Sequence, residues 1–149
     1  MTRTIVTRTI DAPADIVFRA VSDIPNLPET MPDVVKIEFL TDQRVGLGTK
    51  FRETRRMGKR EMVTELDVTE FVENDHVRMV ADSHGTIWDT LFEVTPTGGG
   101  TELTLTMDAR AHKLLPRIMN PIMKGFFKKG IEKHLDSLKT HCEDKAAAR

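Results

Sequence analysis

Three polar residues carry side chains that could polarise a carbonyl group and move protons: Glu53, Arg55 and His134. Glu53 and Arg55 lie two positions apart in a strand-like segment, so a regular strand places both on the face of Phe51. There they would point at the polar end of a bound molecule, or pair with each other in a structural salt bridge. A bulge in the strand would turn both side chains outward and remove the first interpretation.

His134 lies late in a long amphipathic stretch, about one helical turn after Gly130. As a neutral imidazole it would serve as a general acid or base, but we expect a core histidine that is hydrogen-bonded to a strand. Gly130 costs a helix about 1 kcal/mol relative to alanine. Its presence therefore indicates either a close approach of the sheet or room for a ligand.

The sequence lacks the motifs of dinucleotide binding, zinc binding, serine hydrolases and disulfide bonding. Gly46-Leu47-Gly48 has neither the third glycine nor the following helix of a dinucleotide fingerprint, so we interpret it as a hairpin loop. The five histidines have no zinc-ligand spacing, the serines occupy no nucleophile elbow, and the single cysteine, Cys142, allows no internal disulfide. We therefore expect no metal, no cofactor and no hydrolase activity.

Length and charge indicate one globular domain. The chain has 149 residues and a net charge of −1, which gives no reason to expect DNA or another charged polymer as a partner. The sequence has no apolar run of 18 residues and no visible export signal, which predicts a cytoplasmic protein. We expect the domain to span residues 1–143 and residues 144–149 to form a disordered tail.

Hydrophobic spacing predicts the elements that would position these residues. Thr, Val and Ile predict a strand over residues 2–10, and Pro13 suits the first turn of the helix that follows. Prolines limit a second helical piece to about residues 24–31. From residue 34 the period changes to two, and turn residues separate the strands of an antiparallel sheet with one apolar face.

The stretch from Asn120 to Cys142 predicts a long helix with one apolar side. Asn120 suits its N-cap and Pro121 its first position, which makes Leu114 to Met119 a separate turn or a kinked preceding segment. This helix is the only predicted element long enough to cover the apolar face of the sheet.

The order of elements resembles the helix-grip fold of the START-like superfamily, which includes polyketide cyclase/dehydrase-like proteins and the Bet v 1 allergens. Its most specific pieces here are the strand-to-helix passage Thr9–Phe18, the turn Gly46-Leu47-Gly48-Thr49 and the segment Leu103-Thr104-Leu105-Thr106. The departures are Met31, where many bacterial relatives carry tryptophan, and the absence of tyrosine. The resemblance implies an α+β fold: a curved antiparallel sheet of seven strands around the C-terminal helix, with two short helices after strand one.

The resemblance also implies a cavity between sheet and helix that holds an apolar or amphipathic small molecule. The predicted inner face agrees, because it is rich in aromatic residues and in methionine, which adapts to varied ligand shapes. Thr64 and Thr90 share that face and would orient a carbonyl or hydroxyl of the ligand. The candidate ligand-binding residues are Phe51, Met62, Thr64, Leu66, Met79, Trp88, Thr90, Phe92, Leu105, Met107, Met119, Met123, Phe126 and Phe127.

Basic residues predominate on the outward side of the predicted helix. Such a face is usually only solvated, but it would also suit an anionic membrane surface, or ribosomal RNA as proposed for some START-like bacterial toxins. No aromatic residues interleave the lysines, which disfavours nucleic-acid binding. The basic residues are Lys113, Arg117, Lys124, Lys128, Lys129, Lys133 and Lys139.

Three functions therefore remain open. The first is a carrier or sensor that binds a lipid, an isoprenoid or a polyketide-like molecule in the cavity. The second is a cyclase or dehydratase that uses Arg55, Glu53 and His134, and the third is a toxin-like or interaction protein acting through the basic helix face. The lack of tyrosine and the scarcity of inner serines favour binding over catalysis. The identity of the ligand and the oligomeric state do not follow from the sequence.

Overall fold

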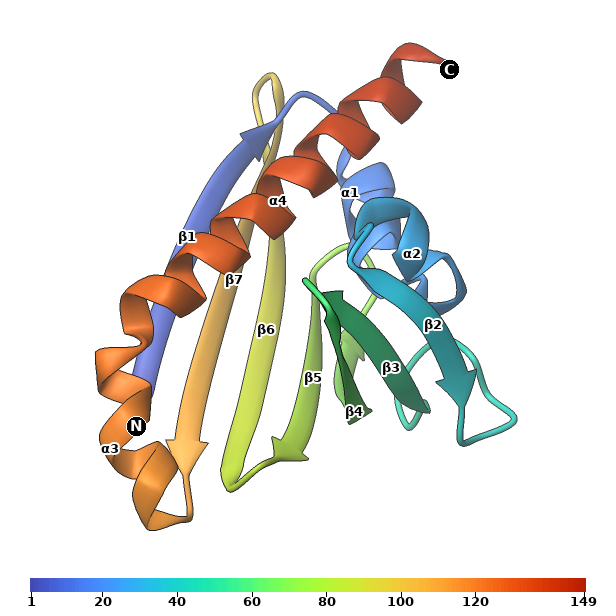
Figure 1. Cartoon of the computed structure of the whole chain (residues 1–149). Helices are drawn as coiled ribbons and strands as arrows, with labels where there is room; N and C mark the ends of the chain where they lie inside the picture. Colours follow the sequence, from blue (N-terminus) through green and yellow to red (C-terminus); the bar gives the residue numbers. More distant parts are fainter.

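The computed structural model describes residues 1–149, except for the side chain of Met57. A helical elbow follows the first strand, six strands then form a meander, and two helices end the chain (Figure 1). The elements are β1 (Thr2–Ile10), α1 (Ala14–Ser22), η1 (Ile24–Asn26), α2 (Leu27–Thr30), β2 (Val34–Phe39), β3 (Lys50–Met57), β4 (Arg60–Val72), β5 (His76–Ser83), β6 (Thr86–Thr97), β7 (Gly100–Ala111), α3 (Leu114–Ile122) and α4 (Lys124–Ala147).

The strands form one antiparallel sheet of seven, in the order β1-β7-β6-β5-β4-β3-β2. Each strand from β2 to β6 pairs with its successor, and β1 forms the edge beside β7, with pairs from Thr2↔Ala109 to Ile10↔Thr101. The sheet curves around α4, which crosses its concave side (Figure 1). This arrangement confirms the predicted helix-grip fold.

The hydrophobic core lies where α4, from Ile131 onward, meets the concave face and α1. Ile131, Leu135, Leu138 and Cys142 are the buried residues of α4, and they recur at the spacing of one helix face. Buried positions alternate along the strands, as in the pattern of β5, because successive side chains of a strand point to opposite faces. The core therefore fixes α4 from Ile131 onward, whereas the first two turns of the helix cover a cavity.

The convex face of the sheet is polar and carries a row of ion pairs. Asp89 is 4% exposed and accepts hydrogen bonds from the guanidinium groups of Arg78 and Arg110, and Arg3 binds Asp108 at 2.7 Å. These contacts hold the pKa of Asp89 below its usual value, with the hydrogen bond from Arg78 as the largest cause. One apolar and one polar face is the pattern expected of an antiparallel sheet covered on one side.

The C-terminal helical segment breaks later than the sequence suggested. Pro121 lies inside α3 rather than at the start of the long helix, and the break falls at Met123. Asn120 is not an N-cap, because its buried side chain instead donates a hydrogen bond to Thr86 Oγ1 at 3.1 Å. α4 continues past residue 143 to Ala147. None of the helices in the described chain is both long and apolar enough to span a membrane.

Candidate functional site

A cavity of about 430 Å³ lies between the concave face of the sheet, the N-terminal half of α4 and the elbow formed by α1 and α2. Its volume falls in the range of roughly 300–1,000 Å³ that is typical of small-molecule sites. The lining consists of Ala20, Val21, Leu27, Met31, Pro32, Asp33, Glu53, Arg55, Leu66, Met79, Trp88, Thr90, Phe92, Leu105, Met107, Phe126, Phe127, Gly130, Ile131, Lys133, His134 and Ser137.

The structure brings most of the predicted site residues together in this cavity. In a pleated sheet, the strands β3 to β7 each present alternate residues to the concave face. The period of two in the sequence therefore predicts which strand residues face the cavity. The predicted residues that line the cavity are Glu53, Arg55, Leu66, Met79, Trp88, Thr90, Phe92, Leu105, Met107, Phe126, Phe127 and His134.

Five predicted residues lie elsewhere. Phe51 is fully buried in the core, and Met119 and Met123 belong to α3 and to the break after it. Met62 and Thr64 lie in the half of β4 that pairs with β3 alone, because pairing between β4 and β5 begins only at Asp67↔Val80. With no strand on their other side, Met62 is 42% exposed and Thr64 is half-buried outside the cavity.

The elbow contributes a wall that sequence reasoning missed. Ala20 and Val21 of α1, Leu27 of α2 and Met31 after it all line the cavity. Ala20 and Val21 do fall on the apolar side of the predicted helix, so a signal was present. It was not connected to the site because α4 was treated as the only cover of the sheet.

Glu53 and Arg55 form an ion pair within the cavity wall. The Arg55 guanidinium donates to Glu53 Oε1, with Nε at 3.3 Å and Nη2 at 3.2 Å, and the two side chains are 37% and 12% exposed, Arg55 being the more exposed. Arg55 Nη2 also lies 3.6 Å from the sulfur of Met31. The pairing of β3 with β4 is regular at these positions, and the register shift on the other side of β3 falls in β2, between Val34 and Lys36, so both side chains keep to the concave face. Because the Arg55 side chain remains partly exposed, donors are left for a ligand.

His134 faces the cavity and is not the hydrogen-bonded core histidine that we expected. No hydrogen bond joins its ring to any side chain or backbone group that the structure describes, and its nearest aromatic neighbour is Phe92, edge-on with ring centroids 6.1 Å apart. Burial lowers the pKa of His134 to about 3, and the positive charge of Arg55 contributes to the shift. The imidazole is therefore neutral at pH 7, with one donor and one acceptor available to a ligand.

Aromatic rings enclose the opposite end of the cavity. Trp88 on β6 and Phe127 on α4 meet edge-to-face with centroids 5.0 Å apart, and the ring of Phe126 lies 6.5 Å from that of Phe127. Phe126 is 58% exposed although it lines the cavity, so it marks a place where the cavity reaches the surface. The lining thus has a polar side, around Arg55 and His134, and an aromatic side.

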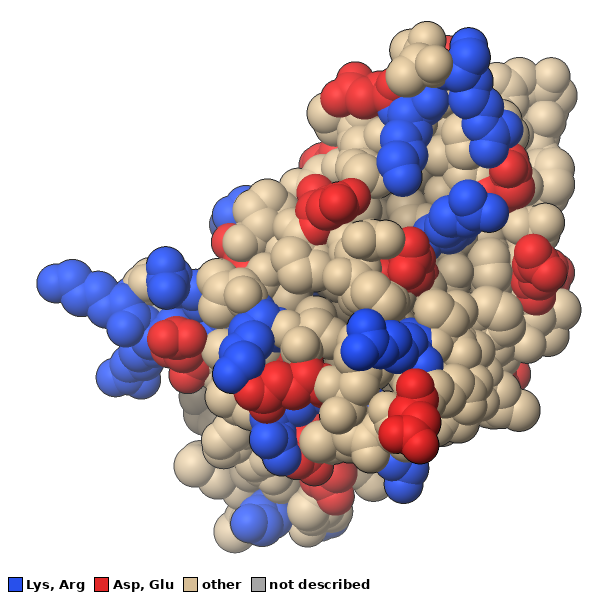
Figure 2. All heavy atoms as spheres, turned by 90° about the vertical axis from the view of Figure 1, so that its right-hand side faces the viewer, with Lys and Arg blue, Asp and Glu red and all other residues tan. Residues whose placement is uncertain are grey.

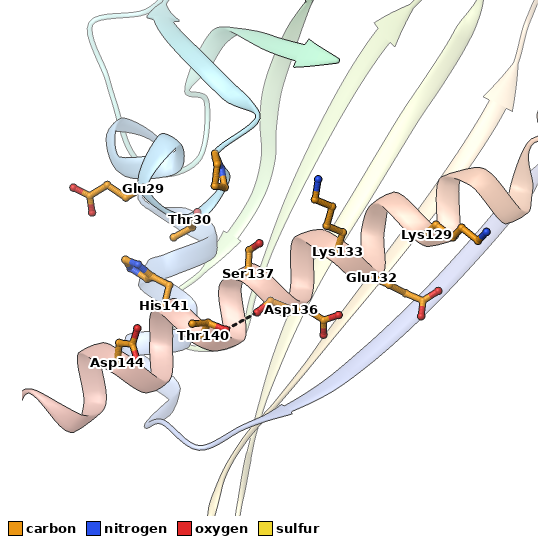
Figure 3. A pocket seen from close by; sticks show the side chains of 11 residues that line it. Glu29, Thr30, Lys129, Glu132, Lys133, Asp136, Ser137, Thr140, His141 and Asp144 are labelled. Atoms are coloured by element: carbon orange, nitrogen blue, oxygen red, sulfur yellow. Dashed lines mark hydrogen bonds between the residues drawn. The ribbon is translucent and has the colours of Figure 1, made fainter. Parts of the chain in front are cut away.

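A wide groove of about 910 Å³ lies outside the cavity, between α2 and the outer side of α4 (Figure 3). Pro32, Lys133 and Ser137 line both spaces, so the groove adjoins the cavity at this side. Figure 3 shows Lys133 and Ser137 pointing from α4 toward the side of α2. Lys133 Nζ lies 3.9 Å from the Asp33 carboxylate, a pair so exposed that it contributes at most about 1 kcal/mol. The groove is a polar vestibule rather than an apolar binding site.

Across the described side chains, no three His, Cys, Asp or Glu residues lie close enough together to hold a metal ion. The polar side chains that line the cavity are those of Asp33, Glu53, Arg55, Thr90, Lys133, His134 and Ser137, and of these Lys133 and Ser137 also line the groove.

A family model described as polyketide cyclase / dehydrase and lipid transport matches residues 1–143. The chain belongs to this family. No curated protein matches the sequence. The family and the cavity together support a role in binding hydrophobic ligands or in cyclase chemistry.

Solved structures show the same fold at low sequence identity. A protein from Thermus thermophilus has a TM-score of 0.78 at 16% identity, covering 97% of this chain and 99% of its own. A START superfamily protein from Mycobacterium smegmatis also reaches 0.78, at 19% identity, with 95% and 97% covered. The di-domain ARO/CYC protein StfQ of the steffimycin biosynthetic pathway reaches 0.81 at 14% identity, with 97% of this chain but 51% of StfQ covered. This member of the polyketide cyclase and lipid transport family thus has the size of one StfQ domain.

Proposed function

We propose that this single domain, residues 1–143, binds a small amphipathic molecule in the cavity between sheet and α4 and acts as a cytoplasmic carrier or sensor. The observation that carries the proposal is the cavity of about 430 Å³, whose apolar walls face a small set of polar groups on one side. Walls of this composition stabilise a ligand by burying its apolar part, while the few polar groups orient it. A lipid, an isoprenoid or a polyketide-like molecule has the required chemistry.

The arrangement favours a ligand with one polar end. Arg55 and the neutral His134 offer hydrogen bonds at one side, and Trp88, Phe126 and Phe127 offer aromatic surface at the other. A carboxylate or carbonyl oxygen would accept from Arg55, since a guanidinium has five N–H donors and Glu53 occupies only part of them.

Ligand binding can be followed through the protein's own fluorescence, because Trp88 is the single tryptophan and lines the cavity. Anilinonaphthalene sulfonate combines an aromatic body with an anionic group that suits Arg55, and it accepts energy from tryptophan. We expect it to quench Trp88 and to be displaced by dodecanoate. Native mass spectrometry of protein purified from its own host should show a retained small molecule.

Two matched substitutions on α4 locate the site. A Cβ atom at Gly130 or at Gly125 meets no atom within 4 Å, but only Gly130 lines the cavity. Gly130→Phe should weaken dodecanoate binding at least tenfold, and Gly125→Phe should leave it unchanged. Equal affinities in both variants, or a protein that retains no ligand and ignores both probes, would contradict the proposal.

Catalysis of the cyclase or dehydratase type is the second candidate, and the observation that favours it is the unpartnered, neutral His134 in the same cavity as Arg55 and Glu53. A neutral imidazole has a free lone pair for a proton from an acidic carbon, and Arg55 would stabilise the developing oxyanion, but the lowered pKa of His134 makes it a weak base at pH 7. His134→Gln separates the two functions. A carrier keeps its affinity for dodecanoate within about threefold, whereas an enzyme loses turnover of a poly-β-keto thioester substrate.

A further inference from the structure

Helix α3 turns its apolar side to solvent, the reverse of a helix that packs against a hydrophobic core. Among its residues Asn120 alone is buried, whereas its large apolar side chains face solvent. The exposed fractions are 71% for Leu114, 70% for Leu115, 55% for Ile118 and 70% for Ile122. Contiguous exposed apolar surface of this kind marks an interaction site.

Polar contacts fix the orientation of α3, so a loosely held helix does not account for the exposure of its apolar side chains. At about 100° per residue, Leu114, Leu115, Ile118, Met119 and Ile122 fall within an arc of about 140°, and Asn120 falls on the opposite side. We call these five residues the α3 apolar face. Asn120 is held by its bond to Thr86, and the chain entering α3 is held by hydrogen bonds to the carbonyl of Gly85.

The α3 apolar face continues to the cavity. Helical hydrogen bonds run through the break after α3, from Met123 N to Met119 O at 2.9 Å and from Phe127 N to Met123 O at 3.0 Å. Phe126 therefore follows Ile122 by about one turn. Because Phe126 is both exposed and part of the cavity lining, it joins the two apolar surfaces.

The charged residues of the segment that carries the α3 apolar face have one sign, and the exposed carboxylate of Asp82, which pairs with His112 at 2.8 Å, lies at the start of this segment. Residues 109–131 contain no Asp or Glu, although the whole chain has a net charge of −1. Lys113, Arg117, Lys124 and Lys128 are all exposed, and no described acidic side chain lies within ion-pair distance of them. The side of the molecule that carries α2, β2 and β3 is different, since it shows basic and acidic residues intermixed (Figure 2).

We infer that the α3 apolar face docks on a bilayer containing anionic phospholipid. An apolar helix face flanked by Lys and Arg lies in the interfacial region of such a bilayer, with its side chains among the acyl chains and its cations near the phosphates. Figure 1 shows α3 at the end of the molecule remote from the C-terminus, where a flat surface can reach it. A symmetric contact between two copies would instead bring the same cations together.

Docking in this orientation places Phe126, and with it an edge of the cavity, beside the acyl chains. A ligand would then pass between bilayer and cavity without crossing water, a consequence that rests on the ligand-binding function proposed above. Docking itself does not depend on that function, and the two can be tested separately.

Co-sedimentation with vesicles tests the inference. Protein should bind vesicles of phosphatidylcholine with about 30% phosphatidylglycerol, bind pure phosphatidylcholine much more weakly, and lose affinity as salt is raised. Ile118→Glu should reduce binding at least tenfold, and Lys124→Gln with Lys128→Gln should reduce it by about fivefold per lysine. Val63→Glu is the matched control, because Val63 is 51% exposed on β4, away from α3, and its variant should bind as the parent does.

Ile118→Glu should leave dodecanoate binding at Trp88 unchanged, so loss of docking is distinguished from loss of the cavity. No binding to anionic vesicles, or equal binding by the Ile118→Glu and Val63→Glu variants, would overturn the inference. So would a dimer in analytical ultracentrifugation that Ile118→Glu dissociates, since the α3 apolar face would then be a contact between two copies.

Discussion

His134 stands in the cavity wall with two ring nitrogens and no described protein partner for either. A polar group in such a place costs free energy unless water or a ligand satisfies it, and the cost is about 1–3 kcal/mol. Arg55 differs, because Glu53 already balances its charge. The imidazole thus offers one donor and one acceptor that a ligand in the cavity can pair.

The depressed pKa of His134 makes stability depend on pH. The ring titrates near pH 6.5 when unfolded and near pH 3 when folded, so below pH 6.5 the unfolded chain binds more protons. The resulting destabilisation is absent above pH 6.5 and grows as pH falls toward 3, by at most about 1.4 kcal/mol per pH unit. The free energy of unfolding of the parent, measured by urea titration, should therefore fall relative to that of His134→Gln below pH 6.5.

His76 provides a control of opposite sign. The hydrogen bond to Asp75 is the main reason that the pKa of His76 is raised, with Glu70 adding to it. Its stabilising contribution is present below pH 6.5 and is lost as pH rises through the folded pKa. The free energy of unfolding of the parent should therefore rise relative to that of His76→Gln on acidification. A parallel pH dependence for both histidine variants would contradict the lowered pKa of His134.

At the scale of elements, α4 has a first segment that covers the cavity and a longer segment, from Ile131 onward, that packs in the core. The buried residues Ile131, Leu135 and Leu138 fix the packed segment, whereas Gly125 and Gly130 lie where an added Cβ would meet open space. Glycine in a helix interior gives up stability relative to alanine. At Gly130 that loss leaves room in the cavity for a ligand.

Gly130→Ala should raise the free energy of unfolding by about 1 kcal/mol, or the melting temperature by about 2–4 °C, because the helix gains propensity without a clash. Gly125 lies in the first turn of α4, so Gly125→Ala should gain less. Thermal unfolding followed by circular dichroism measures both. Destabilisation by Gly130→Ala would show that the sheet approaches the helix closely there, the alternative that the sequence left open.

The sequence predicted the sheet and most of the wall because a period of two assigns each strand residue to a face. It could not show where pairing between neighbouring strands ends, which is why Met62 and Thr64 were placed in the cavity. Nor could local signals place Asn120, since the residue type that caps a helix also forms buried hydrogen bonds such as that to Thr86. A local sequence pattern does not contain the partner of a long-range contact. For the same reason, the sequence could not show that the His134 ring has no hydrogen-bond partner among the described residues.

At the scale of the whole molecule, an internal cavity and the stability of the fold oppose each other. A fold whose own side chains leave a cavity of about 430 Å³ gives up packing contacts that a solid core would make. A ligand that binds the folded chain alone restores them and stabilises the protein by RT ln(1 + [L]/Kd). Thermal stability is therefore a measure of occupancy that needs no knowledge of the natural ligand.

Dodecanoate at about 100 times its Kd should stabilise the parent protein by about 2.7 kcal/mol, a shift of roughly 5–11 °C in melting temperature. Gly130→Phe should lose this ligand-dependent shift because its ring occupies the ligand's space. Ile118→Glu should keep the shift, since its side chain lies outside the cavity on α3. Differential scanning calorimetry with and without dodecanoate measures all three. An undiminished shift in Gly130→Phe would place the ligand outside the cavity between sheet and α4.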